Sequence, residues 1–358
     1  MKKIVLTGGG TAGHVTPNIA LLPALQAAGY EIAYVGSYEG IEKKLIADFN
    51  IPYTGISTGK FRRYLDPKNF SDPFRVMKGF VEARNYLKNY QPDVVFSKGG
   101  FVSVPVVRAA ASLHIPCIIH ESDMTPGLAN KLCIPVAEKV CCNFPETMKN
   151  IPADKAVLTG SPIRAELAEG SKLAGLNMCG FTANKPVIMV IGGSLGAANV
   201  NKAVRDALPK LLEDFQVVHL CGKDKIDNLL LNTPGYKQFE YIKAELKDIF
   251  AMADVGISRA GANAICELLA LKKPNILIPL PAASSRGDQL LNAASFEAQG
   301  YSIVLNEDDI TTNLLVAKVH ELYFNRQNYV DAMSKSHQMD AVKTIMELIN
   351  AAAEKKTN

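Results

Sequence analysis

The sequence has no long apolar run, and its first residues do not have the pattern expected of a secretory leader. No stretch approaches the roughly 20 apolar residues that a transmembrane helix needs. The apolar run after Met1-Lys-Lys is too short for a signal peptide, and no small-residue cleavage site follows it. The 358 residues are 48% hydrophobic and 21% charged, which is typical of a globular protein large enough for two domains. We therefore expect a cytoplasmic protein.

The sequence also lacks Cys-x-x-Cys spacing of the kind that binds zinc. Most of its seven cysteines lie inside apolar runs, which is typical of buried free thiols in a reducing compartment. They are Cys117, Cys133, Cys141, Cys142, Cys179, Cys221 and Cys266. We expect no chemistry from them.

Short apolar runs alternate with helical patterns, which indicates parallel sheets covered by helices. Strands are predicted in the first half at Lys3–Thr7, Glu31–Gly36, Pro52–Ser57, Asp93–Ser97, Pro116–His120, Lys139–Asn143 and Ala156–Thr159. Strands are predicted in the second half at Val187–Ile191, Gln216–Cys221, Phe239–Ile242, Asp254–Ser258, Asn275–Ile278 and Tyr301–Leu305.

The two halves open alike, since an apolar strand runs into a glycine-rich turn at Gly8–Gly13 and again at Gly192–Gly196. This repetition predicts an α/β fold of two similar doubly wound domains. The boundary is expected between Thr159 and Lys185. A final helix from Ala341 has one apolar face, and the pattern does not say which domain it covers.

The stretch from Val255 to Ala293 has the pattern of a nucleotide-sugar site. A strand ends at Ser258, a glycine turn follows at Gly261, and the N-terminus of the next helix would favour a diphosphate. The carboxylate of Glu267 interrupts that apolar helix and could accept hydrogen bonds from two sugar hydroxyls. The alternative for this glutamate alone is a solvated position or an internal ion pair.

The turn Gly8–Gly13 matches the dinucleotide pattern Gly-x-Gly-x-x-Gly, but the acidic residue of a nicotinamide site is missing. The second strand ends as Val35-Gly-Ser-Tyr, and Glu39 comes late. An NAD-dependent oxidoreductase is therefore a weaker alternative.

His14 follows the glycine turn where a helix begins, just before Thr16-Pro17, a plausible N-cap and first-turn pair. The positive helix end disfavours imidazolium, so we expect a neutral ring that can accept a proton from an alcohol. Alternatively, it hydrogen-bonds the turn or donates to a phosphate. At the end of another strand, Glu121 is a second functional candidate, whereas Asp123 could be only a helix cap.

The segment from Lys60 to Lys88 holds eight basic residues against three acidic ones. One interpretation is a core-facing helix with a solvated basic face. The other is an apolar and basic surface that docks on anionic lipid, where each cation would contribute about 1 kcal/mol to membrane binding. We favour docking for Lys60–Leu65. The residues assigned to this surface are Lys60, Arg62, Arg63, Phe74, Arg75 and Lys78. A non-enzymatic protein that binds membrane or nucleic acid through this segment would leave Glu267 unexplained.

In their order and spacing these motifs resemble the MurG family, which adds N-acetylglucosamine to lipid I to make lipid II in peptidoglycan synthesis. The resemblance covers essentially the whole chain and rests on Gly9–His14, His120-Glu121, Gly160–Arg164, Gly192–Ala197, and Ser258–Glu267 with Gln289. It implies a GT-B fold of two Rossmann-like domains facing across a cleft. Residues 1–162, joined by a C-terminal helix 340–358, would face the acceptor and the membrane. Residues 163–339 would bind UDP-N-acetylglucosamine.

The resemblance also implies roles by position. Glu267 would bind the ribose, Gln289 the sugar hydroxyls, and the backbone of Ile242 the uracil. Ser194 and Arg164 would contact the diphosphate, while Thr11, Ala12 and Gly13 would close over the donor or cradle acceptor phosphates. The remaining donor-binding candidates are Asp123, Ala262, Asn263, Ala264, Ile265 and Cys266. His14 and Glu121 are the catalytic candidates.

The family inverts the anomeric carbon, which needs a base on the acceptor hydroxyl opposite a leaving UDP. Helix ends and Arg164 can stabilise the leaving charge, so no metal cofactor is required, although stimulation by a divalent ion stays open. No Asp-x-Asp motif lies in a suitable loop.

The implied partners are UDP-N-acetylglucosamine, an undecaprenyl-linked acceptor and an anionic membrane, with no nucleic acid. The protein would sit peripherally on the inner face of the cell membrane. The alternative acceptor is another lipid, such as a diacylglycerol.

Overall fold

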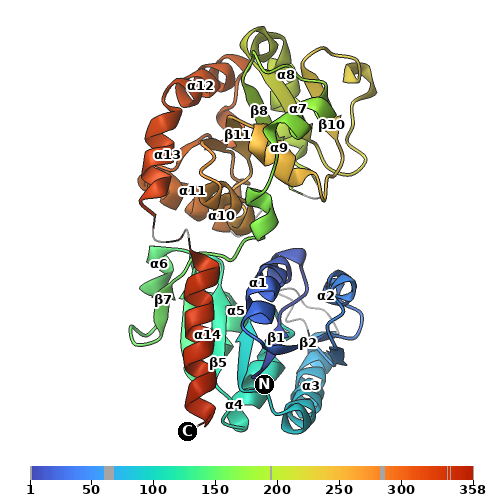
Figure 1. Cartoon of the computed structure of the whole chain (residues 1–358), viewed down its shortest axis with the longest axis vertical. Coiled ribbons are helices and arrows are strands. Elements are labelled where there is room, and N and C mark those ends of the chain that lie inside the picture. The colour runs from blue at the N-terminus through green and yellow to red at the C-terminus, as the bar shows by residue number, and fades with distance from the viewer. Residues whose placement is uncertain are drawn as a thin grey trace. The chain divides into compact units, whose positions relative to one another are not determined.

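The computed structural model contains two parallel β-sheets, each covered by helices (Figure 1). The structure describes residues 2–59, 68–193, 196–282, 287–336, 338 and 340–357, without the side chains of 68–73, 356 and 357. By its internal contacts the chain divides into two units. The first is Met1–Arg164 with Asp340–Asn358, and the second is Ala165–Met339.

The first sheet has the order β3-β2-β1-β4-β5-β6-β7, and all its neighbouring strands are parallel. The order reverses between β1 and β4, so the loops after these two strands meet at a switch point, where α/β sheets bind ligands. The strands are β1 Lys3–Thr7, β2 Glu31–Ser37, β3 Tyr53–Ile56, β4 Val94–Ser97, β5 Cys117–Glu121, β6 Lys139–Cys142 and β7 Ala156–Leu158.

Apolar side chains cover both faces of this sheet. One core cluster joins the sheet to α3 and α4, and the other joins it to α1 and α14. Ile345 and Ile349 of α14 are fully buried there, so the last helix covers the first unit (Figure 1). The helices are α1 Thr16–Ala27, α2 Ile41–Ile46, α3 Lys68–Tyr90, α4 Ser103–Ser112, α5 Leu128–Cys133, α6 Pro145–Met148 and α14 Ala341–Thr357, with 3-10 turns η1 Ala12–His14, η2 Ala47–Phe49 and η3 Ile134–Val136.

The second sheet has the order β10-β9-β8-β11-β12-β13, again all parallel, and reverses between β8 and β11. Its strands are β8 Val187–Ile191, β9 Gln216–Leu220, β10 Tyr236–Phe239, β11 Val255–Ser258, β12 Asn275–Leu277 and β13 Ser302–Val304. Its helices are α7 Lys172–Cys179, α8 Ala198–Asp214, α9 Leu246–Met252, α10 Ala262–Ala270, α11 Asp288–Ala298, α12 Thr312–Phe324 and α13 Arg326–Ser334, with 3-10 turns η4 Ala165–Ala168, η5 Asn228–Leu230 and η7 Glu307–Asp309.

One predicted strand is misplaced. The sequence pattern favoured Phe239–Ile242, whereas β10 covers Tyr236–Phe239 and pairs with β9. As the edge strand, β10 buries Tyr236 and Gln238 and leaves Lys237 half-buried, so it alternates instead of forming a continuous apolar run. Ile242 lies beyond the strand with its side chain buried.

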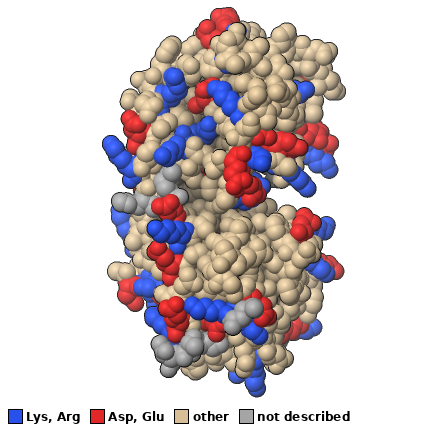
Figure 2. Space-filling model, viewed as in Figure 1, with Lys and Arg blue, Asp and Glu red and all other residues tan. Residues whose placement is uncertain are grey.

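The seven cysteines are buried free thiols, as expected, and burial raises the pKa of Cys133 to about 12. Among the described residues, no helix is long and apolar enough to cross a membrane. On the face that Figure 2 shows, Lys and Arg are interspersed with Asp and Glu over both units.

Candidate active site

Two glycine loops meet at the switch point of the first sheet. The Gly9 N–H faces the Gly99 carbonyl at 3.4 Å. A Cβ atom on Gly100 would lie 2.3 Å from the Gly9 carbonyl oxygen, so only glycine fits there. The loop after β1 and the loop after β4 therefore form one packed unit.

His14 is fixed by the first of these loops. Its Nδ1 lies 3.1 Å from the Gly9 carbonyl oxygen and 3.1 Å from Thr11 Oγ1. Because a carbonyl can only accept, Nδ1 carries the proton, and Nε2 of the neutral ring keeps its lone pair. This arrangement suits a general base.

The charge state of His14 agrees with the expectation, but the cause differs. Burial and the neighbouring Lys98 ammonium lower the pKa of His14 to about 4, so the ring is neutral at pH 7. The expected capping by Thr16 is wrong, since Val15 is the N-cap of α1. The Thr16 hydroxyl instead donates to the Ala12 carbonyl.

The sequence analysis missed Lys98, which follows β4 and is only 1% exposed. Its Nζ donates to the Ser122 hydroxyl, which follows β5. Burial, and then the Lys98 charge, also hold the pKa of His120 well below its usual value. The apolar strand Val94–Ser97 runs through Lys98 into Gly99 and Gly100, which is the signal already used for the turn after β1.

Glu121, the second catalytic candidate, is hydrogen-bonded within its own loop. It is 3% exposed, and its carboxylate accepts hydrogen bonds from the N–H groups of Asp123 at 2.9 Å and Gly127 at 3.0 Å. The Asn130 amide donates to it at 2.8 Å. Glu121 therefore shapes the loop before α5, and its catalytic role stays a prediction. Asp123 is half-buried and does not cap α5, whose N-cap is Gly127.

In the second unit, α10 begins directly after the glycine turn, with Gly261 as its N-cap. Glycine offers no capping side chain, so the first-turn backbone, Ala262 to Ala264, suits an anion. The donor-binding roles expected for Ile265 and Cys266 are not supported. Both side chains are buried, and the Ile265 N–H already donates to the Gly261 carbonyl. Glu267 is half-buried.

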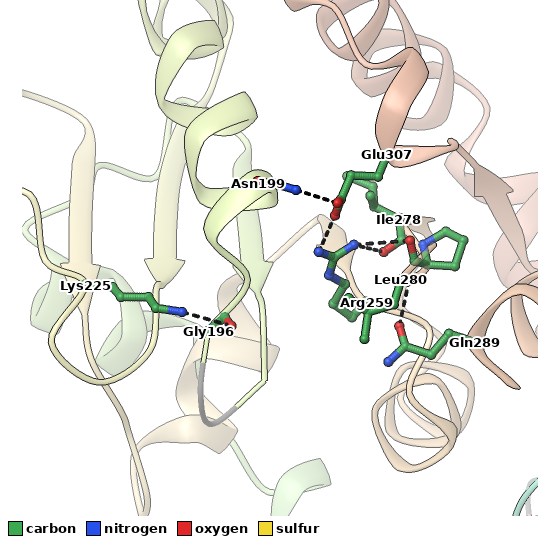
Figure 3. Close-up of polar contacts among 9 residues, drawn as sticks. Gly196, Asn199, Lys225, Arg259, Ile278, Leu280, Gln289 and Glu307 are labelled. Carbon is green, nitrogen blue, oxygen red and sulfur yellow. Dashed lines mark hydrogen bonds and ion pairs between the residues drawn. The ribbon is translucent and has the colours of Figure 1, made fainter. Parts of the chain in front are cut away.

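Arg259 joins the loops at the carboxyl edge of this sheet, and sequence analysis missed it (Figure 3). Its Nη1 donates to the carbonyls of Ile278 at 3.0 Å and Pro279 at 3.2 Å, and its Nη2 pairs with Glu307. Glu307 in turn accepts from the Asn199 amide at 2.6 Å. One guanidinium thus connects the segments that follow β8, β11, β12 and β13.

Gln289 lies on α11 beside this network (Figure 3). The Leu280 N–H donates to its Oε1 at 3.1 Å, which leaves Nε2 as the donor of that amide. In the other half of the sheet, Lys225 donates to the Gly196 carbonyl at 3.2 Å and holds the turn after β8. Ser194, expected at the diphosphate, lies outside the described residues.

Of the remaining predicted residues, Thr11 and Ala12 belong to the first glycine loop, and the others come from other segments of the chain. Arg164 is half-buried at the end of the first unit's first segment, and Thr11 and Ala12 are exposed beside His14. Phe74, Arg75 and Lys78 are exposed on α3. Lys60, Arg62 and Arg63 lie outside the described residues. Within the described ranges, no cluster of His, Cys, Asp or Glu could hold a metal ion.

Comparison with known proteins identifies the family. Residues 4–142 match the glycosyltransferase family 28 N-terminal domain, and residues 187–349 match the glycosyltransferase family 28 C-terminal domain. The chain is 65% identical to the UDP-N-acetylglucosamine–N-acetylmuramyl-(pentapeptide) pyrophosphoryl-undecaprenol N-acetylglucosamine transferase of Lachnospira eligens, over 98% of this chain and 99% of that protein. The chain belongs to the MurG family.

A second MurG relative, the transferase of the same name from Lachnoclostridium phytofermentans, is 64% identical over 98% of each chain. The crystal structure of Acinetobacter baumannii MurG is similar with a TM-score of 0.77 at 29% identity, over 98% of this chain and all of that one. The expected GT-B fold and glycosyltransferase class are thereby confirmed. The dehydrogenase alternative is set aside.

Proposed function

We propose that this glycosyltransferase moves N-acetylglucosamine from UDP-N-acetylglucosamine to undecaprenyl-pyrophosphoryl-N-acetylmuramyl pentapeptide, converting lipid I to lipid II. The observation that carries the proposal is the activity printed in the name of a 65% identical relative that matches 98% of this chain. Two independent features of the chain support it, a site suited to a nucleotide sugar in the second unit and a neutral histidine with an unprotonated Nε2 in the first.

The second unit would bind the donor. The diphosphate would accept hydrogen bonds from the first turn of α10, where the helix dipole favours negative charge. Glu267 would accept from the ribose hydroxyls, and Nε2 of Gln289 would donate to the sugar. The Ile242 backbone would face the uracil. Arg259 would act indirectly, by fixing the loops on which these groups lie.

His14 would be the base of the transfer. Nε2 would take the proton of the acceptor sugar hydroxyl as its oxygen attacks the anomeric carbon of the donor. The bond from that carbon to the β-phosphate oxygen breaks, and its electron pair leaves with UDP. The α10 N-terminus and Arg164 would stabilise the leaving charge. Attack from the opposite side inverts the anomeric carbon.

We propose that α3 brings the first unit to an anionic membrane. Phe74, Met77 and Val81 recur every three or four residues, so they share one helix face, and they are 78%, 67% and 53% exposed. Arg75 and Lys78 are exposed beside them. Exposed apolar side chains next to cations are typical of surfaces that lie in the lipid interface.

Replacing Phe74 and Met77 with serine should weaken vesicle binding, because apolar area and cations act together at the interface. The measurement is co-sedimentation with vesicles containing anionic lipid. Phe324→Ser is the matched control, since Phe324 is 74% exposed but lies on α12 of the second unit. If the α3 variant and the Phe324 variant lose vesicle binding equally, or if neither loses it, α3 is not the docking surface.

Glu267→Ala should weaken binding of UDP-N-acetylglucosamine about 10- to 100-fold, because a hydrogen bond to a charged group contributes roughly 1.5–3 kcal/mol. Isothermal titration calorimetry measures the affinity. The control is Glu297→Ala, which removes an exposed carboxylate from α11 of the same unit. Unchanged donor affinity in the Glu267 variant would exclude the ribose contact.

Parallel titrations with UDP-N-acetylglucosamine, UDP-glucose and NADH test the donor assignment. We expect heat of binding with the first, weaker binding of the second and none with NADH. Preference for UDP-glucose would refute the proposed donor.

A further inference from the structure

Glu42 is a buried carboxylate that the proposed reaction does not use. It lies on α2 of the first unit and is 1% exposed. A buried ionised carboxylate is costly unless donors surround it, so its hydrogen bonds indicate what it holds in place.

Three hydrogen bonds hold this carboxylate against the glycine turn. The Gly10 N–H donates to Oε2 at 3.1 Å. The Ser37 N–H and hydroxyl donate to Oε1 at 2.9 and 2.5 Å. Glu42 therefore connects the turn after β1 to the end of β2.

The carboxylate also fills the space beside three glycines. A Cβ atom on Gly9 would lie 2.4 Å from the Glu42 carboxyl carbon, and one on Gly40 would lie 2.1 Å from Oε1. A Cβ on Gly36 would lie 2.8 Å from Glu42 Cγ. Gly9 is not among the residues with a positive φ angle, so glycine is required there for space and not for conformation.

The same turn binds His14 on its other side, because the Gly9 carbonyl accepts from Nδ1 of the ring. The Gly9–Gly10 backbone thus lies between Glu42 and His14. Glu42 also uses the Gly10 N–H, a donor that a dinucleotide phosphate would need. A carboxylate in that place repels a phosphate, which explains why a Gly-x-Gly-x-x-Gly turn here is not a dinucleotide site.

We propose that Glu42 is a positioning residue for the transfer: it fixes Gly9 and Gly10 so that the Gly9 carbonyl holds His14 in the tautomer that leaves Nε2 free to accept a proton. Only the kinetic consequence of this inference rests on the proposed function. The tautomer itself is a property of the free protein.

The test compares Glu42→Gln with Asp93→Asn. Glutamine keeps the size of the side chain, but its NH₂ group must face a backbone N–H, either that of Gly10 or that of Ser37. Asp93 is the matched control, because its carboxylate accepts the Lys3 N–H at 2.6 Å on the same sheet, at the opposite end of the strands. Long-range ¹H–¹⁵N spectra of the imidazole rings give the tautomer directly.

In the wild type and in Asp93→Asn we expect His14 protonated at Nδ1. In Glu42→Gln we expect a mixture of the two tautomers, because the loosened turn no longer holds the Gly9 carbonyl against Nδ1. The charges that act on this ring are Lys98 and Glu42. The kcat for transfer should fall roughly 100-fold with the donor KM unchanged, as expected for a misplaced base.

Gly9→Ala tests the same contact from the side of the turn, because its new methyl group would displace the Glu42 carboxylate. It should change the His14 spectrum in the same way, and it should add little in a Glu42→Ala background. If His14 stays protonated at Nδ1 in both Glu42→Gln and Gly9→Ala, the inference is overturned. If the wild type transfers no N-acetylglucosamine, the proposed function is wrong. The spectra of the free protein would still show whether Glu42 fixes the His14 tautomer.

Discussion

Replacing His14 with alanine should lower kcat about 10²- to 10⁴-fold, the range for loss of a general base. The expectation follows from the hydrogen bond between Nδ1 and the Gly9 carbonyl, which leaves the unprotonated Nε2 as the nitrogen that can accept a proton. Donor affinity should stay near that of the wild type, because the donor contacts proposed above do not include the His14 ring and, apart from Arg164, lie in the second unit.

Steady-state kinetics with separate variation of donor and acceptor measure this effect. His114→Asn is the control, since His114 is exposed and has a φ of 56°, a conformation that asparagine tolerates. Wild-type turnover in His14→Ala would reduce His14 to a residue that stabilises the turn.

The pH dependence gives an independent check on the same residue. A base works only when unprotonated, so kcat/KM should fall as the pH drops through the pKa of His14, about 4, and not near 6.5. Replacing Lys98 with methionine removes a charge that lowers this pKa, so the acid limb should move to higher pH.

Arg259→Met should destabilise the second unit by about 3–5 kcal/mol, as expected when one partner of a buried ion pair is removed. The side chains of Arg259 and Glu307 are 10% and 8% exposed. The substitution leaves the Glu307 carboxylate without its cation and two carbonyls, of Ile278 and Pro279, without their donor. Because the released segment continues to Leu280, the partner of Gln289, donor affinity should fall as well.

Urea unfolding followed by circular dichroism measures the effect, since the chain has no tryptophan to report by fluorescence. Lys318→Met breaks an ion pair with Glu321 whose side chains are 33% and 45% exposed, and should cost less than about 1 kcal/mol. The double variant Arg259→Met, Glu307→Met should recover much of the loss, because an apolar pair avoids the buried charge. Equal stability of Arg259→Met and wild type would contradict the role of Arg259 as the connection between these loops.

Much of the fold could be predicted because parallel strands are buried on both faces and read as short apolar runs. The two glycine-rich turns and the Gly261 turn could be predicted for the same reason, because each follows a short apolar run. The exception, β10, is an edge strand that alternates buried and half-buried residues, so no continuous run marked it.

The residues that organise the loops could not be predicted. Lys98, Glu42 and Arg259 carry charged groups, which usually lie in solvent, and nothing in the local sequence indicates that these are buried. Their partners are distant along the chain, as with Arg259 and Glu307 or Glu42 and Gly10. Glu121 was found as a candidate, but the sequence does not reveal that its oxygens accept hydrogen bonds within its own loop.

The most direct test of the proposed function is a transfer assay with UDP-N-acetylglucosamine and an undecaprenyl-pyrophosphoryl-N-acetylmuramyl pentapeptide acceptor. We predict release of one UDP per acceptor and a disaccharide with a β linkage, the inverse of the α linkage in the donor. Transfer to a diacylglycerol but not to this acceptor, or an α-linked product, would contradict the account.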